Sequence, residues 1–157
     1  MNLTLWDKRF LRMAREVSAW SRDPSHRVGA VAVKDRRIIA TGYNGFPRGV
    51  EDLDWRWRTK ELKYRYVVHG EMNCIYNAAY NGISLVDTTL YVYGLPVCHE
   101  CAKGIIQAGI TRVVGAADLA DGIPQRWYES YKKTVAMFDE VSVQFTLTDE
   151  LTLLEEV

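Results

Sequence analysis

The sequence predicts an α/β fold in which helices cover both faces of a mixed five-stranded sheet. The chain has 157 residues, 48% of them hydrophobic and 25% charged, which is typical of one globular domain. Short, β-branched apolar runs alternate with longer segments in which apolar residues recur at helical spacing. The resulting order, α-β-β-α-β-α-β-α-β, places the sheet between two helical layers. We therefore expect residues 1–157 to form a single three-layer α-β-α domain.

The first half of the chain is expected to contain one helix, a β-hairpin and a long irregular segment. The helix ends at Asp23-Pro24-Ser25, and the two strands of the hairpin flank a polar turn. A loop rich in turn residues follows, and after it comes a polar, aromatic stretch. The helix covers residues 6–20, and the two strands cover 28–33 and 38–41. The loop covers residues 42–49, and the aromatic stretch covers 51–66.

The second half is expected to contain three helices and three strands in alternation. Gly82 and Gly109 end the first two helices, and Pro124 suits the start of the third. The helices cover residues 70–81, 98–108 and 124–138. The strands cover residues 88–93, 112–115 and 141–147. Residues 118–157 thus hold the last helix, the last strand and an acidic tail. An apolar stripe on the last helix is expected in the core, and it comprises Trp127, Tyr128, Tyr131, Val135 and Phe138. Of these residues, Tyr128 or Tyr131 is a candidate pocket wall.

Composition excludes several classes of function. Twenty basic residues balance twenty acidic residues, so a general basic field for long nucleic acid is not expected. No apolar run approaches the roughly 18 residues of a membrane helix. Residues 1–10 lack the layout of a secretory signal. Three cysteines, an odd number with one close pair, indicate metal or redox chemistry in a reducing compartment, so the cytoplasm is expected.

The strongest functional signal combines His69-Gly70-Glu71 with Cys98-His99-Glu100-Cys101. A C-x-x-C pair alone fits a structural zinc site or a redox disulfide equally well. A His-x-Glu on a preceding helix favours a catalytic zinc site, because zinc deaminases use one His and two Cys as ligands and a Glu as acid and base. Three protein ligands, His69, Cys98 and Cys101, leave the fourth tetrahedral position open for water.

The predicted helices support this interpretation. The three ligands fall at helix N-termini, where the helix dipole favours thiolate over thiol and neutral imidazole over imidazolium. Two thiolates cancel the charge of Zn²⁺ and weaken it as a Lewis acid. The bound water therefore needs a carboxylate to accept its proton, and we assign that task to Glu71.

The other cysteine and histidines receive more ordinary interpretations. Cys74 is expected to be a small buried core residue. His99 lies between the two ligands but should point away from the metal, at the surface. His26 is expected to be a solvated loop residue, with a phosphate contact as the alternative.

With these motifs in view, the sequence resembles the deoxycytidylate (dCMP) deaminases of the zinc-dependent cytidine deaminase superfamily. The resemblance covers residues 10–115 and rests on four stretches: DPSHRVGAVAV, TGYNGFPRG, HGEMNCI and CHECAKGIIQAGI. Of these, the Gly-Tyr-Asn-Gly-x-Pro pattern is typical of dCMP deaminases and not of nucleoside or tRNA deaminases. The resemblance implies a cytidine-deaminase-like fold.

It also implies a reaction and a set of binding partners. The reaction is hydrolysis of dCMP to dUMP and ammonia, with Glu71 shuttling protons, Asn44 holding the sugar and Asn73 fixing the nucleotide. Relatives are often homohexamers, activated by dCTP and inhibited by dTTP. For this chain the resemblance implies a homo-oligomer, a hexamer or a dimer, with dCTP and dTTP as possible effectors. The candidate effector or phosphate residues are Gly42, Tyr43, Gly45, Pro47 and Arg48.

Two departures from the family pattern keep other substrates open. Gly70 replaces the usual alanine, which predicts a wider pocket beside the metal. Val97 separates Pro96 from Cys98, where the family has Pro directly before Cys, so the grip on the base is expected to differ. A modified dCMP, a cytidine nucleoside or a purine base remains an alternative substrate. A non-catalytic nucleotide-binding regulator is the alternative from another class.

Two weaker signals concern basic and aromatic side chains. The cluster Trp55-Arg56-Trp57-Arg58 fits base stacking, but a subunit interface or a folded-over loop is favoured, because Trp and Arg are enriched at interfaces. Arg48 and Lys60 are candidates for phosphate or effector binding.

Overall fold

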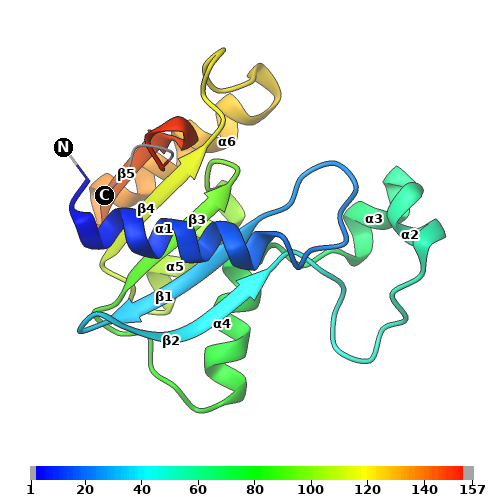
Figure 1. Cartoon of the computed structure of the whole chain (residues 1–157), viewed down its shortest axis with the longest axis horizontal. Coiled ribbons are helices and arrows are strands. Elements are labelled where there is room, and N and C mark those ends of the chain that lie inside the picture. Colours follow the sequence, from blue (N-terminus) through cyan, green and yellow to red (C-terminus); the bar gives the residue numbers. More distant parts are fainter. Residues whose placement is uncertain (1–2, 154–157) are drawn as a thin grey trace.

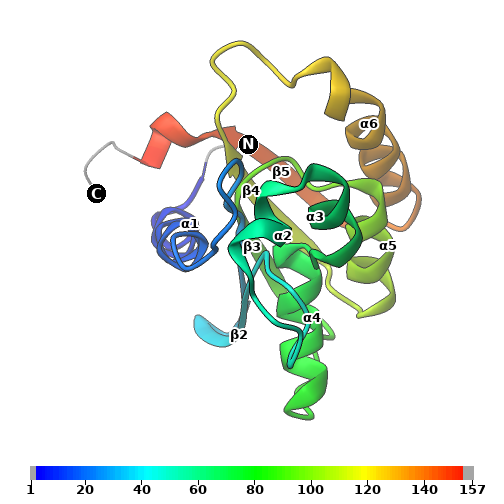
Figure 2. The same cartoon turned by 90° about the vertical axis from the view of Figure 1, so that its right-hand side faces the viewer.

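A computed structural model describes residues 3–153 and shows a five-stranded sheet between two layers of helices (Figures 1 and 2). The strand order is β2-β1-β3-β4-β5; β1 pairs antiparallel with β2 and β3, whereas β3, β4 and β5 run parallel. The predicted α/β class and mixed sheet are confirmed. The strands are β1 Gly29–Lys34, β2 Arg37–Tyr43, β3 Thr89–Gly94, β4 Arg112–Ala117 and β5 Gln144–Asp149. The helices are α1 Leu5–Ser18, α2 Asp54–Arg58, α3 Lys60–Tyr66, α4 Gly70–Tyr80, α5 His99–Gln107 and α6 Gln125–Glu140, with a 3-10 turn η1 at Glu150–Leu153.

Helix α1 covers one face of the sheet, and α4, α5 and α6 cover the other (Figure 2). A capping box starts α1, because Thr4 Oγ1 accepts from the backbone N–H of Asp7 while the Asp7 carboxylate accepts from Thr4 N–H. Each layer approaches the sheet over a glycine. A Cβ on Gly29 would lie 2.1 Å from Ala14 O in α1, and one on Gly42 would lie 2.1 Å from Cys74 N in α4. Close packing on both faces therefore depends on these two residues.

Two parallel crossovers place the functional helices. Helix α5 connects β3 to β4, and α6 connects β4 to β5, so both lie on the α4 side of the sheet. The short helices α2 and α3 lie beyond one end of the sheet, near the N-terminus of α4 (Figure 1). None of the described helices is long and apolar enough to cross a membrane.

The structure corrects the prediction in two regions. The polar stretch 51–66 folds into α2 and α3, which are too short to show an apolar period. The last strand begins at Gln144 rather than at residue 141, because α6 continues to Glu140 and Ser142 turns the chain with a φ of 59°. Within the aromatic cluster, Trp57 is only 4% exposed, and the centroid of its ring lies 4.2 Å from that of Phe46, on which it stacks. This packing supports the prediction of a folded-over loop. Trp55 of the same cluster is exposed.

Candidate metal centre and catalytic cavity

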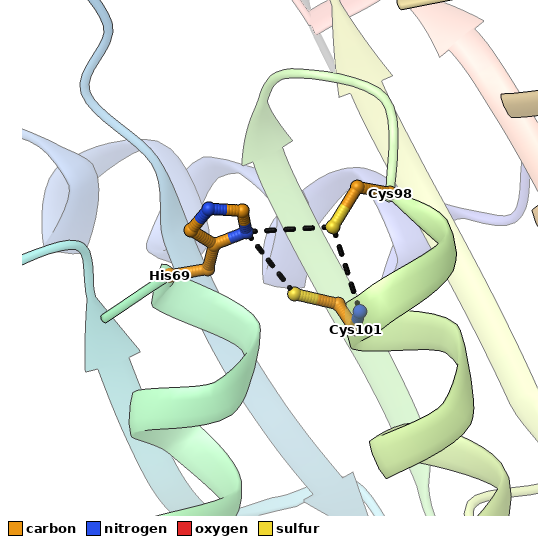
Figure 3. Close-up of side chains that lie close together, drawn as sticks. All are labelled: His69, Cys98 and Cys101. Atoms are coloured by element: carbon orange, nitrogen blue, oxygen red, sulfur yellow. Dashed lines mark hydrogen bonds between the residues drawn. The ribbon is translucent and has the colours of Figure 1, made fainter. Parts of the chain in front are cut away.

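Three side chains from the N-termini of two neighbouring helices converge on one point (Figure 3). His69 is the N-cap of α4, Cys98 is the N-cap of α5, and Cys101 lies in the first turn of α5. Nδ1 of His69 lies 3.4 Å from the sulfur of Cys98 and 3.3 Å from the sulfur of Cys101. The predicted ligand trio is therefore assembled, with all three donor atoms within 4.8 Å of one another.

This arrangement fits a zinc ion. Zinc–nitrogen bonds of about 2.0 Å and zinc–sulfur bonds of about 2.3 Å at tetrahedral angles place nitrogen and sulfur ~3.5 Å apart. The observed separations of 3.3 and 3.4 Å are close to that value. One imidazole and two sulfurs form a donor set that zinc favours, and three protein donors leave a position for water.

Hydrogen bonds within the trio lower the pKa of Cys98 but raise those of His69 and Cys101. Contrary to expectation, the helix N-termini alone therefore do not hold every ligand in its metal-binding form. The hydrogen bond with Cys98 raises the pKa of His69 to about 9. Hydrogen bonds with Cys101 and then His69 lower the pKa of Cys98 to about 4, so Cys98 is a thiolate at neutral pH. The adjacent Cys98 sulfur and burial raise the pKa of Cys101. A bound cation would displace the remaining protons, because metal ligands bind in their deprotonated forms.

Glu71 lies beside the metal centre in the first turn of α4. Its side chain is buried, at 3% exposure, and its Oε2 atom lies 3.7 Å from the sulfur of Cys101. Burial raises the pKa of this carboxyl. A carboxyl whose pKa moves towards neutrality can both accept and return a proton, which is the property expected of a general acid and base.

The metal centre opens into a cavity of about 260 Å³, just below the range of about 300–1,000 Å³ that is typical of small-molecule sites. His69, Glu71 and Cys98 line it together with residues from five other segments. These segments are the loop before β1, the residue that follows β2, helix α3, the turn before α5, and helix α6. The lining from outside the metal centre includes Asp23, His26, Val28, Asn44, Lys60, Lys63, Tyr64, Leu95, Pro96, Val97, Arg126, Trp127 and Ser130.

A buried ion pair forms part of the cavity wall. Lys63 of α3 donates from Nζ to Oδ1 of Asp23 at 2.7 Å, and both side chains are less than 10% exposed. Burial would raise the pKa of Asp23, but the hydrogen bond from Lys63 and the backbone N–H groups of Ser25 and His26 hold it below its ordinary value. The pair therefore fixes the loop before β1 against α3.

The two predicted substrate asparagines lie in different places. Asn44 lines the metal cavity, where its Oδ1 accepts from Val28 N–H and its Nδ2 donates to His26 O and to Asp23. Asn73 lies outside that cavity. Its Nδ2 donates to Tyr43 O at 2.8 Å, and its side chain lines a second, separate cavity of about 460 Å³.

The predicted effector residues gather around this second cavity, with one exception. Tyr43, Gly45, Pro47 and Arg48 line it. Arg48 is hydrogen-bonded to Asn77 and lies 4.3 Å above the ring of Tyr80. Gly42 is not among the lining residues, because it packs against the backbone of α4. Arg48 is thus separated from the metal cavity, whereas Lys60 lines it.

Helix α6 supplies a cavity wall as expected, but through Trp127 rather than through Tyr128 or Tyr131. Trp127 was expected in the core, but it lines the cavity, while Tyr128 is exposed and Tyr131 packs near Phe145. His26 is also not a freely solvated loop residue. Its ring lies 5.1 Å from that of Trp127, and burial followed by the charge of Arg126 lowers its pKa. The residues concerned are about 100 positions apart, and no local sequence pattern reveals such a contact.

The remaining predictions for the motif residues are confirmed. Cys74 is fully buried in the core. His99 is half exposed and lies outside the ligand trio, with its Nδ1 2.8 Å from Ser130 Oγ.

The two departures from the family pattern have local consequences. A methyl group on Gly70 would meet the carbonyl oxygen of Val28 at 3.0 Å and its side chain at 3.2 Å, so Val28 occupies the space that the missing methyl was expected to open. The expectation of a wider pocket is therefore wrong at this point. The extra residue Val97 is accommodated by burial, at 1% exposure.

Comparison with known proteins agrees with this site. Residues 4–117 match the family model for the cytidine and deoxycytidylate deaminase zinc-binding region. An uncharacterised deaminase of Aliivibrio fischeri is 38% identical over 144 residues, covering 92% of this chain and 94% of the relative. The deoxycytidylate deaminase of Homo sapiens is 38% identical over 149 residues, covering 89% of this chain and 78% of the relative.

A solved structure shares the fold. The dCMP deaminase of cyanophage S-TIM5, crystallised with dCMP and dUMP, superposes with a TM-score of 0.73 at 22% identity and covers 94% of this chain and 100% of that one. The family match spans both helices that carry the ligand trio and the acidic residue beside it. The chain therefore belongs to the family of zinc-binding cytidine and deoxycytidylate deaminases.

Proposed function

We propose that this protein is a zinc-dependent hydrolase that converts dCMP to dUMP and ammonia. The observation that carries the choice of substrate is the pattern of charge in the metal cavity. Glu71 is buried beside the ligand trio, whereas Lys60 and Arg126 are exposed and line the same cavity. A cavity with a buried carboxyl and cationic side chains at its mouth suits a base that carries a phosphate.

The three cations of the cavity are not equivalent. The charge of Lys63 is compensated by Asp23. Within residues 3–153, no carboxylate lies within 4.0 Å of the charged groups of Lys60 or Arg126. Arg126 instead contacts the neutral ring of His26, with Nη2 3.3 Å from Nε2. Lys60 and Arg126 are therefore available to a substrate anion, which favours a nucleotide over a nucleoside.

The residues of the chain divide the chemistry between them. Zinc held by His69, Cys98 and Cys101 would activate a water molecule. Glu71 accepts a proton from that water and delivers protons to N3 of cytosine and to the departing amine, so that water is consumed and ammonia leaves. Asn44 lines the same cavity and is proposed to contact the sugar. Trp127 provides an aromatic wall of the cavity.

The choice of substrate is tested with a panel of cytosine and purine compounds. We expect kcat/KM for dCMP to exceed that for deoxycytidine by about 100-fold, since two charge-assisted contacts contribute about tenfold each. Lys60→Met and Arg126→Met should each raise KM for dCMP about tenfold and leave deoxycytidine unaffected. Lys133→Met, on an exposed position of α6 outside the cavity, is the matched control. Release of ammonia from guanine or cytidine with dCMP untouched would refute the proposed substrate.

The role of Glu71 has its own test. Glu71→Gln should lower kcat by at least a thousandfold, because the amide cannot shuttle protons, while one zinc per chain remains bound. Loss of zinc or of the fold in this variant would contradict the assignment. Full activity in this variant would reject Glu71 as the proton shuttle. A zinc-loaded parent protein without any deaminase activity would favour the alternative of a nucleotide-binding regulator with structural zinc.

Assembly, effectors and compartment complete the proposal. We propose that the chain forms a homo-oligomer, a dimer or a hexamer. Binding of dCTP or dTTP is supported by the second cavity, which has one arginine, Arg48, and three exposed tyrosines nearby: Tyr43, Tyr76 and Tyr80. Sedimentation and assays with each triphosphate test them, with Arg48→Met expected to weaken the response. The reduced state that Cys98 and Cys101 need for zinc supports a cytoplasmic location.

A further inference from the structure

The two cysteine ligands are held in different ways. Cys101 lies within α5 and is only 1% exposed, so the helix itself fixes its sulfur. Cys98 is the N-cap residue, in extended conformation, at the end of the turn that joins β3 to α5 (Figure 3). The position of its sulfur therefore depends on what holds that turn. This turn also contains the extra residue Val97 and lines the cavity from Leu95 to Cys98.

Helix α6 contacts the turn on both sides of Cys98. Thr134 donates from Oγ1 to the carbonyl oxygen of Val97 at 2.9 Å. Ser130, one helical turn earlier, accepts at Oγ from the backbone N–H of His99 at 3.0 Å. Val97 and His99 are the direct neighbours of Cys98 in the chain. Two hydroxyl groups of one helix thus hold the backbone before and after a metal ligand.

The bond to Val97 has no replacement from solvent. The carbonyl of Val97 precedes α5 and lies outside its hydrogen-bond ladder, whose bond to Ala102 N–H starts at the carbonyl of Cys98. Val97 is 1% exposed and Thr134 is fully buried, so water does not reach this bond. A buried carbonyl that loses its donor incurs a desolvation cost, which the turn can relieve only by moving. Movement of Val97 displaces Cys98.

We propose that Thr134, with Ser130 as a weaker second contact, is a positioning residue for the metal centre. Its hydroxyl fixes the carbonyl of Val97, and this places the sulfur of Cys98 and the adjoining cavity wall. This inference rests on the proposed function only for its activity readout. Metal retention and ligand geometry can be measured without any substrate.

The decisive variant is Thr134→Val, which keeps the shape of the side chain and removes the hydroxyl. We expect zinc to be lost to a chelator about tenfold faster and kcat for dCMP to fall about tenfold, as for other partners of metal ligands. KM should change less than about threefold, since Lys60 and Arg126 are untouched. In protein loaded with Co²⁺, the sulfur-to-cobalt absorption should shift. Thr134→Ser should restore all three properties.

The control is Phe138→Leu, a substitution in the same helix one turn further from the metal centre. Phe138 is fully buried and faces Phe145 of β5 at 5.3 Å. This variant should lose thermal stability while zinc release, the cobalt spectrum and kcat stay as in the parent. If Thr134→Val behaves like Phe138→Leu, or if Thr134→Ser fails to restore the parent values, the proposal is wrong.

Ser130→Ala keeps the proposal testable should Thr134→Val fail to fold. Ser130 is partly exposed, so water can replace part of its contact, and we expect a severalfold faster release of zinc. Unchanged zinc release and an unchanged cobalt spectrum in Ser130→Ala would then overturn the proposal. If the parent protein does not act on dCMP, a shift in the cobalt spectrum of a variant still supports the positioning role, and only the proposed substrate is rejected.

Discussion

Two buried carboxylates form ion pairs on opposite sides of this molecule, and they serve different ends. Asp7, in the first turn of α1, accepts hydrogen bonds from Arg112 of β4 at 2.7 Å and from the hydroxyl of Tyr91 of β3 at 2.8 Å. Asp23, at the cavity, accepts from Lys63 of α3 and orients Asn44. The first network joins a helix to the sheet away from the metal centre. The second shapes the wall of the cavity.

The comparison shows that a buried charge does not by itself indicate a functional site. Both carboxyl groups have a lowered pKa, although burial alone would raise each of them. What distinguishes them is the surroundings: Asp23 shares its cavity with His69 and Glu71, whereas Asp7 lies on the opposite face. Loss of the Asp7 network should therefore affect stability alone, and loss of the Asp23 network should affect stability and activity.

The largest effect on stability is expected from Asp7→Ala. This substitution leaves Arg112 and Tyr91 without their buried partner, and the free energy of unfolding should fall by about 3–5 kcal/mol. Urea denaturation measures this loss, and kcat/KM of the folded fraction should remain that of the parent. A catalytic defect in folded Asp7→Ala would break the distinction between the two networks.

A smaller loss of stability, joined to a loss of activity, is expected from Lys63→Met. Asp23 keeps the backbone N–H groups of Ser25 and His26 as donors, so the loss should be about 1–3 kcal/mol. Because the loop that these residues form lines the cavity, kcat/KM for dCMP should also fall, by about tenfold. Stability and steady-state kinetics measured on the same preparation test this. Unchanged kinetics would place Lys63 in a purely structural role.

Acid sensitivity should separate the two networks further. A carboxyl whose pKa is lowered by folding contributes stability above its unfolded pKa of about 4, and this contribution is lost as the pH falls below that value. In that range each such group adds up to ~1.4 kcal/mol per pH unit to the slope of the free energy of unfolding against pH. Asp7→Asn should flatten the slope more than Asp23→Asn, because the pKa of Asp7 is the more strongly lowered. Equal slopes would contradict this order.

The smallest effect is expected from Gly70→Ala, which restores the family residue. The new methyl group would approach the carbonyl of Val28 at 3.0 Å, so Val28 must shift by a few tenths of an ångström. We expect less than about 1 kcal/mol of destabilisation and less than about a threefold change in kcat/KM for dCMP. Gly29→Ala, on the α1 side, should be far more damaging, because its Cβ would lie 2.1 Å from Ala14 O. A changed base preference in Gly70→Ala would restore the wider-pocket hypothesis.

The sequence was most informative where chemistry is encoded over short distances. The spacing of His69 and Glu71, and that of Cys98 and Cys101, places each pair on one helix turn, so the helix alone sets their relation. The order of apolar segments predicted the sheet and both helical layers. The short helices α2 and α3 were not predicted, since five and seven residues cannot show a helical period.

The sequence by itself thus determined which side chains are placed to hold a metal and which carboxyl stands beside them, because these depend on residue type and on spacing within helices. Only the tertiary structure decided what surrounds them. It brought α6 against the metal-ligand turn, placed Arg126 beside His26, and put Asn73 and Arg48 in a separate cavity. Those contacts join residues far apart in the sequence, and they form only when the helices pack on a common sheet.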